Sequence, residues 1–204
     1  MALLTLLSIA LLAQPSEEPL QTAICNPVGN VENGVIENFN LRCPPVETDP
    51  DGYIDYLNAL LAAFPETVEL PRSSHSSIED SISLTHTDHG WRLTEPTPLI
   101  RVAPDYPLRA AQNGVSGRCA VRLNISETGH AEVTATACEM FRGRAPRSSN
   151  MFERKTLDAV EAFVWLPMPG QAQTCHTTVM DFLIDGHTIP DAPVLNAPTC
   201  PDAP

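Results

Sequence analysis

The stretch 116-SGRCAVRLNISETGHAEVTATACEM-140 decides the fold, because it has the pattern of two strands joined by a tight turn. From Cys119 to Ile125 every second residue is apolar, and the polar residues Arg122 and Asn124 lie between, which is typical of a strand with one buried face. Gly129 can adopt the positive φ that closes a three-residue loop over residues 127–129. Residues 131–139, rich in Val, Thr and Ala, are then predicted to form the return strand.

A helix is predicted on each side of this hairpin. Pro107 suits the first turn of the upstream helix, where its missing N–H costs nothing, and Gly114 suits the C-terminal end. Downstream, five apolar residues recur at helical spacing on one face: Phe152, Leu157, Val160, Phe163 and Val164. Candidate N-caps for this second helix are Ser148, Ser149 and Asn150.

A third strand is predicted over residues 177–184, after Pro167 and Pro169 have ended the helical segment. The helix carries the chain back across the sheet once, so this last strand runs antiparallel to the first hairpin strand. An all-antiparallel sheet then has the order second-first-last. The predicted fold class is α+β, with a three-stranded antiparallel sheet and two helices in the order α-β-β-α-β. The last strand is an exposed edge, which is a template for an added strand.

An ordered set of short motifs runs through the same region: VAPDYPLRA at 102–110, GVSG at 114–117, the Gly129 hairpin, and a run of apolar residues from 152 to 167. Together these motifs resemble the C-terminal domain of TonB energy transducers, over residues 98–185. The resemblance assigns a structural role to Tyr106, Pro107, Ala110, Gly114, Gly117, Gly129, Phe152, Ala159, Val160, Trp165 and Pro167. It implies a periplasmic domain that binds a short segment of an outer-membrane receptor by adding it to the sheet edge.

The expected partner-binding edge is the last strand: His176, Thr177, Thr178, Val179, Met180, Asp181 and Phe182. Main-chain hydrogen bonds would supply affinity and outward side chains selectivity. The even-numbered residues share one face of this strand, and the odd-numbered residues, continuing to Leu183, share the other. Both sets contain apolar residues, so the sequence does not tell which face meets the helices. No catalytic residue, metal or cofactor is predicted for this domain.

Charge and the N-terminal segment bear on location. The chain has 25 acidic and 12 basic residues and a formal charge of −13, which argues against binding to a phosphate backbone. Residues 2–13 form an apolar run of signal-peptide length, shorter than the roughly 20 residues of a membrane span. We therefore expect export to the periplasm with cleavage near Ala13 or near Ala23; an uncleaved anchor is the alternative. Neither a spanning helix nor a long Pro-rich linker of the kind in full TonB transducers is recognisable, which leaves energy coupling open.

Six cysteines in an exported chain indicate disulfides, and six allow 15 pairings. Sequence separation and the predicted sheet favour three of them: Cys25 with Cys43, Cys119 with Cys138, and Cys175 with Cys200. The second pair requires a bulge in the second hairpin strand, because a three-residue loop otherwise places Cys119 opposite Ala137. The third pair would hold the Pro-rich tail, residues 187–204, over the edge strand.

Residues 14–97 are predicted to form a small α+β module of unknown role. A helix is expected over residues 51–64 and one or two strands over residues 78–93, with a turn at 88–90. No internal repeat is recognisable. His86 and His89 lack an evident third metal ligand and are interpreted as solvated turn residues. Two alternatives stay open: a metal-dependent hydrolase centred on this module, and an envelope protein whose own tail covers the edge.

Overall fold

The structure, a computed structural model, describes residues 21–32, 35–64, 67–69, 76–78, 81–142, 146–184, 188–189, 194 and 196–200. The predicted signal segment lies outside these residues. Strands and helices follow in the order β1 (Thr22–Glu32), β2 (Val35–Arg42), α1 (Pro50–Ala63), β3 (Thr67–Glu69), β4 (Ser76–Ile78), β5 (Ile82–Thr87), β6 (Gly90–Leu93), β7 (Pro98–Val102), α2 (Leu108–Gln112), β8 (Ser116–Ile125), β9 (Ala131–Phe141), β10 (Arg147–Ser148), α3 (Glu153–Glu161), β11 (Val164–Trp165) and β12 (Gln173–Phe182).

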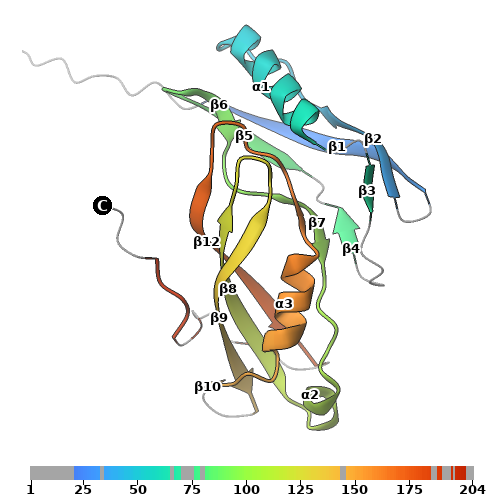
Figure 1. The fold of residues 1–204 in the computed structure, drawn as a ribbon, viewed down its shortest axis with the longest axis vertical. Coiled ribbons are helices and arrows are strands. Elements are labelled where there is room, and N and C mark those ends of the chain that lie inside the picture. Colours follow the sequence, from blue (N-terminus) through green and yellow to red (C-terminus); the bar gives the residue numbers. More distant parts are fainter. Residues whose placement is uncertain are drawn as a thin grey trace, which may run out of the picture.

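The C-terminal sheet has the order β10-β9-β8-β12, and its strands are antiparallel. The order of its three long strands confirms the predicted second-first-last arrangement. The expectation of three strands is wrong in one respect, because the two-residue strand β10 pairs with the end of β9 as a fourth. Figure 1 shows α3 lying against one face of this sheet, below the part of the molecule formed by β1, β2 and α1.

The central hairpin is built as predicted, and its irregularity explains the disulfide. Gly129 has φ +79°, and the N–H of Ser126 donates to the carbonyl oxygen of His130 across the loop. The register shifts after Arg122 by one extra residue in β9, and Cys119 thereby comes to lie opposite Cys138. The two cysteines are bonded, with a Cα–Cα distance of 4.0 Å. The predicted bulge in the second strand is confirmed.

The helix α3 is shorter than predicted and starts differently. Phe152 occupies its N-cap position without a side-chain cap bond, so the three candidate caps, Ser148, Ser149 and Asn150, are wrong. The helix ends at Glu161, and Val164 and Trp165 form the strand β11, which pairs with β7. β-branched and aromatic residues fit a pleated surface well, and the pairing with β7 outweighs the helical spacing of the apolar residues.

The strand β12 begins at Gln173, four residues before the predicted start at Thr177, and it ends at Phe182 rather than Ile184. Its early part contains an irregularity between Gln173 and His176, where Cys175 has φ +62°. A residue in this left-handed region bends the strand locally. From His176 to Phe182 the pairing with β8 is continuous.

The N-terminal part forms a five-stranded sheet of order β3-β2-β1-β5-β6, with α1 against one face. The helix and the β5–β6 hairpin agree with the sequence predictions, but β1 and β2 were not anticipated. A third sheet, β11-β7-β4, contains strands from both halves of the chain. One core cluster of buried side chains includes Cys25 and Leu60 from the first half and Leu123 and Trp165 from the second.

Candidate partner-binding edge

The strand β12 forms one border of the C-terminal sheet. Among the described residues it pairs with β8 alone, over the register His176↔Leu123 to Phe182↔Gly117. An exposed strand border presents unpaired N–H and C=O groups to any strand that approaches. The sequence predicted this position for the last strand, and the structure places it there.

The hydrogen bonds of the hairpin fix which β12 groups face outward. The N–H of Ser149 donates to the carbonyl oxygen of Cys138, so the main-chain groups of Cys138 point away from β8. In an antiparallel ladder the opposite residue, Cys119, then directs its own groups away from β9 and toward β12. Cys119 is in register with Met180. By alternation, the main-chain groups of Thr177, Val179 and Asp181 point away from β8, toward the open border.

Side chains on β12 alternate between the two faces of the sheet. Met180 and Phe182 are buried on the face that meets the helices. Val179 lies on the opposite face and is 53% exposed. Asp181, on the same face as Val179, accepts two hydrogen bonds from the guanidinium of Arg118, at 2.6 and 2.9 Å. The question that the sequence left open is therefore answered: the even-numbered residues face the helices.

An aromatic cluster packs against the C-terminal end of β12, on the face of the sheet that meets the helices. The ring centroids of Phe152 and Phe182 lie 4.7 Å apart, and the ring of Tyr106 meets both edge-on. The hydroxyl of Tyr106 donates to the carbonyl oxygen of Val115, at 2.6 Å. Tyr106 is thus a packing residue that joins the segment before α2 to β12.

The other residues of the TonB-like motif occupy structural positions. Ala110, Gly117, Phe152, Ala159, Val160, Trp165 and Pro167 are buried. Gly114 and Gly129 have positive φ. A Cβ atom at Gly117 would overlap the Phe152 ring, so the glycine allows that ring to lie against β8.

A disulfide attaches the C-terminal tail to the N-terminal part of β12. Cys175 is bonded to Cys200, and Cys25 is bonded to Cys43, so all three favoured disulfides are present. Arg122, on the face of β8 that points away from the helices, donates a hydrogen bond to the carbonyl oxygen of Thr199. The described part of the tail therefore contacts a face of the sheet. No strand pairing between it and β12 occurs in the described residues.

His176 lies at the start of the edge strand, half-buried against Trp165. The ring centroids are 5.5 Å apart and the rings meet edge-on. Burial lowers the pKa of His176 below its ordinary value of 6.5; the charge of Glu95 opposes this shift, and that of Arg101 adds to it. The structure thus favours the neutral imidazole at the base of β12.

This environment predicts a pH dependence of stability. The pKa of His176 is lowered in the folded state. The neutral imidazole therefore contributes to the free energy of unfolding in full above pH 6.5, and this contribution is lost as the pH falls through the folded-state pKa. Between pH 7.5 and 5.5, we expect the melting temperature of the His176→Gln variant to fall by less than that of the wild type. The exposed His89 provides the control, and His89→Gln should retain the wild-type slope. Equal slopes in all three proteins would contradict this account.

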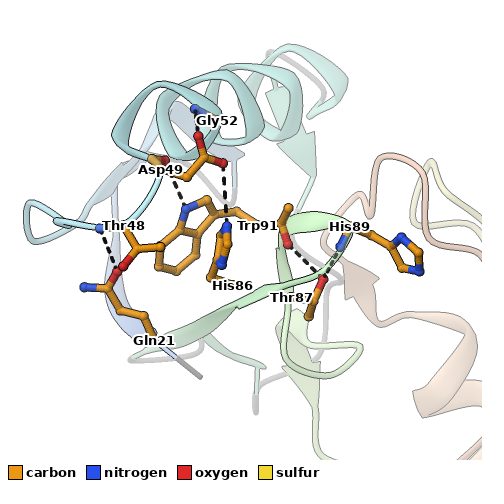
Figure 2. A network of polar contacts seen from close by, with 9 residues as sticks. Gln21, Thr48, Asp49, Gly52, His86, Thr87, His89 and Trp91 are labelled. Atoms are coloured by element: carbon orange, nitrogen blue, oxygen red, sulfur yellow. Dashed lines mark hydrogen bonds and ion pairs between the residues drawn. The ribbon is translucent and has the colours of Figure 1, made fainter. Parts of the chain in front are cut away.

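The histidines of the HTDH motif do not converge. His86 lies against Trp91, and its Nε2 is 3.7 Å from a carboxylate oxygen of Asp49, whereas His89 is exposed at the turn. Figure 2 shows the two imidazoles pointing in different directions. The interpretation of His86 as a solvated turn residue is wrong, because it joins β5 to the start of α1. The described residues contain no group of three His, Cys, Asp or Glu side chains placed to hold a metal ion.

Comparison with known families agrees with the motif and the geometry. Residues 102–182 match the family model described as the Gram-negative bacterial TonB protein C-terminal. No match to the chain was found among curated proteins. In the part of the chain that the structure describes, no helix is long and apolar enough to cross a membrane. Residues 102–182, about two fifths of the chain, are therefore similar to the TonB C-terminal domain family, whose members are protein-binding domains of the bacterial envelope.

Proposed function

We propose that residues 98–186 form an exported, periplasmic interaction domain that takes up a partner peptide as an added strand along β12. The observation that carries this proposal is the border of β12 along which no other described strand pairs, and toward which the main-chain groups of Thr177, Val179 and Asp181 point. Three adjacent pairs of donors and acceptors suit an extended peptide of about five or six residues, at the roughly 3.3 Å rise of a strand. The partner we propose is a segment of an outer-membrane receptor, which would link the protein to TonB-dependent transport.

The surroundings of the border support selectivity as well as affinity. Val179 offers an exposed apolar contact on one face. The Arg118–Asp181 pair beside it supplies a fixed charge pattern. Alternate side chains of an added strand would meet these groups, while its main chain bonds to β12. We propose that residues 14–97 form a separate module, whose strand β4 pairs with β7 of this domain.

A proline at position 179 tests the added strand. The N–H of Val179 points away from β8, so Val179→Pro removes an outward donor without removing a bond between β8 and β12. We expect the variant to bind the partner about tenfold more weakly, since one lost hydrogen bond and the proline ring both oppose pairing. The measurement is capture of envelope proteins from a Gram-negative extract, followed by titration of the captured segment.

The matched control is Val179→Ala, which removes the same side-chain contact and keeps the N–H. It should bind within about threefold of the wild type, since a small exposed apolar contact contributes little. Melting temperatures of both variants establish that they are folded. If the proline and alanine variants capture the same proteins in the same amounts, strand addition at β12 is wrong.

A further inference from the structure

The two hairpins of the chain, β1–β2 and β8–β9, are built in the same way. Cys25 is the fourth residue of β1, and Cys119 is the fourth residue of β8. Cys25 is bonded to Cys43, the residue directly after β2, and Cys119 is bonded to Cys138 on β9, at sequence separations of 18 and 19. The Cα–Cα distances are 4.2 and 4.0 Å, so both bonds cross the hairpin between directly opposed positions.

The irregularities of the two hairpins also coincide. In β1–β2 the register shifts after Val28, three residues beyond Cys25; in β8–β9 it shifts after Arg122, three residues beyond Cys119. Both shifts place the extra residue on the second strand: β1 advances by two residues where β2 advances by three, and β8 by one where β9 advances by two. A bulge at the same offset and on the same strand is a specific feature of a hairpin.

A helix and a third strand complete both halves. Each helix places an aromatic ring from its N-terminal end against the disulfide: Tyr53 has its hydroxyl 3.5 Å from Cys25, and Phe152 packs in one cluster with Cys119 and Cys138. Each third strand then pairs antiparallel with the first strand, with a buried residue opposite the cysteine: Ile82 in β5 and Met180 in β12. The order second-first-third is the same, β2-β1-β5 and β9-β8-β12.

The sequences of the hairpins carry a weak trace of this likeness. An Asn and a β-branched residue stand five and six positions after the first cysteine, at Asn30 and Val31 in one hairpin and at Asn124 and Ile125 in the other. A glycine stands nine positions before the second cysteine in both, as the pairs Gly34/Cys43 and Gly129/Cys138 show. The single residue of difference in length falls before the glycine. These few matching positions are too sparse to be recognised as an internal repeat from the sequence alone.

We propose that residues 22–94 are a second ββαβ unit of the same construction, and that its third strand, β5, is a strand-acceptor edge occupied by the chain's own strand β6. In the five-stranded sheet β6 lies on the side of β5 away from β1. Beside β12, no described strand occupies the corresponding position. The inference concerns the β5 edge, so it stands or falls separately from the proposed partner of β12.

The contacts of β6 show the chemistry that this edge accepts. Trp91 and Leu93 are buried on the face that meets α1, and Trp91 packs against Tyr53 with ring centroids 4.7 Å apart. The indole N–H of Trp91 donates to the main-chain oxygen of Asp49, as Figure 2 shows. A strand with an aromatic and an aliphatic residue at alternate positions, both turned toward the helix, therefore fits beside β5.

The ladder between β5 and β6 identifies the residue to change. The N–H of Thr94 donates to the carbonyl oxygen of Ser83, whereas the N–H of Leu93 donates to the hydroxyl of Tyr56 and so points away from β5. Alternation then directs the N–H of Arg92 toward Thr85, its register partner. Arg92→Pro removes this hydrogen bond. Arg92→Ala removes the same side chain but keeps the main-chain N–H and its hydrogen bond.

The experiment measures uptake of a synthetic, fluorescent peptide of residues 87–95 by the full chain. We expect Arg92→Pro to bind the peptide at least about tenfold more tightly than Arg92→Ala and the wild type, because only the proline variant frees the β5 edge. A peptide that itself carries proline at the Arg92 position should not bind. Equal, weak binding by the folded proline and alanine variants would overturn the proposal.

A second variant, with a protease site in the turn between β5 and β6, tests the same proposal if Arg92→Pro does not fold. Asp88 and His89 are exposed at the turn between β5 and β6, so a protease site can replace them and be cut after folding. Cutting lets the free peptide compete with β6, which then has only one covalent attachment. Exchange of the fluorescent peptide into the cut protein, and not into the uncut protein, supports an acceptor edge on β5. The absence of exchange at peptide concentrations up to millimolar overturns it.

Discussion

Replacing Cys119 and Cys138 together with alanine is expected to lower the free energy of unfolding by about 2–5 kcal/mol. The bond ties the two central strands together where the sheet, α3 and the aromatic cluster meet, and both cysteines are buried. Its removal raises the conformational entropy of the unfolded chain, and it also loosens the packing against Phe152 in the folded protein. Denaturant unfolding of the wild type and the double variant measures the loss.

The bond between Cys175 and Cys200 provides the comparison. It closes a longer stretch of chain, at a separation of 25 against 19 residues, so chain entropy alone predicts an equal or slightly larger effect. The packing argument predicts the reverse order, with the larger loss at Cys119 and Cys138. A loss there of under about 1 kcal/mol, or one no larger than that of the Cys175→Ala/Cys200→Ala variant, would refute the structural role given to this bond.

Truncation of Phe152 is expected to cost about 3–5 kcal/mol of stability. The ring is fully buried and packs against Tyr106 and Phe182, so Phe152→Ala leaves a cavity beside the end of β12. Because Phe182 belongs to the edge strand, the variant should also bind a partner segment more weakly. Chemical denaturation and the peptide titration described for Val179 give the two readouts.

Gly117 supplies an internal test of this geometry. In the wild type, Gly117→Ala places a methyl group against the Phe152 ring, at a distance that the ring cannot accept without moving, and should cost about 1–3 kcal/mol. In the Phe152→Ala background the same methyl group enters the cavity, so its cost should vanish or change sign. Additive losses in the double variant would show that the two residues do not meet.

The hairpin, its turn and the order of the long strands were predictable from local patterns and one topological argument. Alternation over residues 119–125 and the need of Gly129 for positive φ leave little freedom. The bulge in β9 followed from a conflict between loop length and the preferred disulfide. In these places local preference and tertiary structure agree.

Tertiary pairing decided what the sequence could not. Val164 and Trp165 extend the apolar spacing of α3, but they pair with β7 as a strand. β1 and β2 escaped prediction because apolar residues are sparse and their alternation is interrupted at the bulge between Val28 and Asn30. The role of His86 was missed because its partner, Asp49, lies on a different element.

For the candidate site, topology predicted the border but not its orientation. Both faces of β12 carry apolar residues, so only the position of Phe182 among the aromatic rings reveals the buried face. Which main-chain groups are open depends on the register with β8, a three-dimensional property. The likeness of the two halves was hidden because it resides in cysteine spacing and bulge position more than in residue identity.

Amide hydrogen exchange at β12, with and without the captured partner segment, tests strand addition most directly. The account predicts that binding slows exchange at the outward-facing amides of Thr177, Val179 and Asp181, and leaves those of Thr178 and Met180, already bonded to β8, nearly unchanged. This alternating pattern is specific to a strand paired along the border. Binding that leaves the three outward amides exchanging at their free rate would contradict the proposed function.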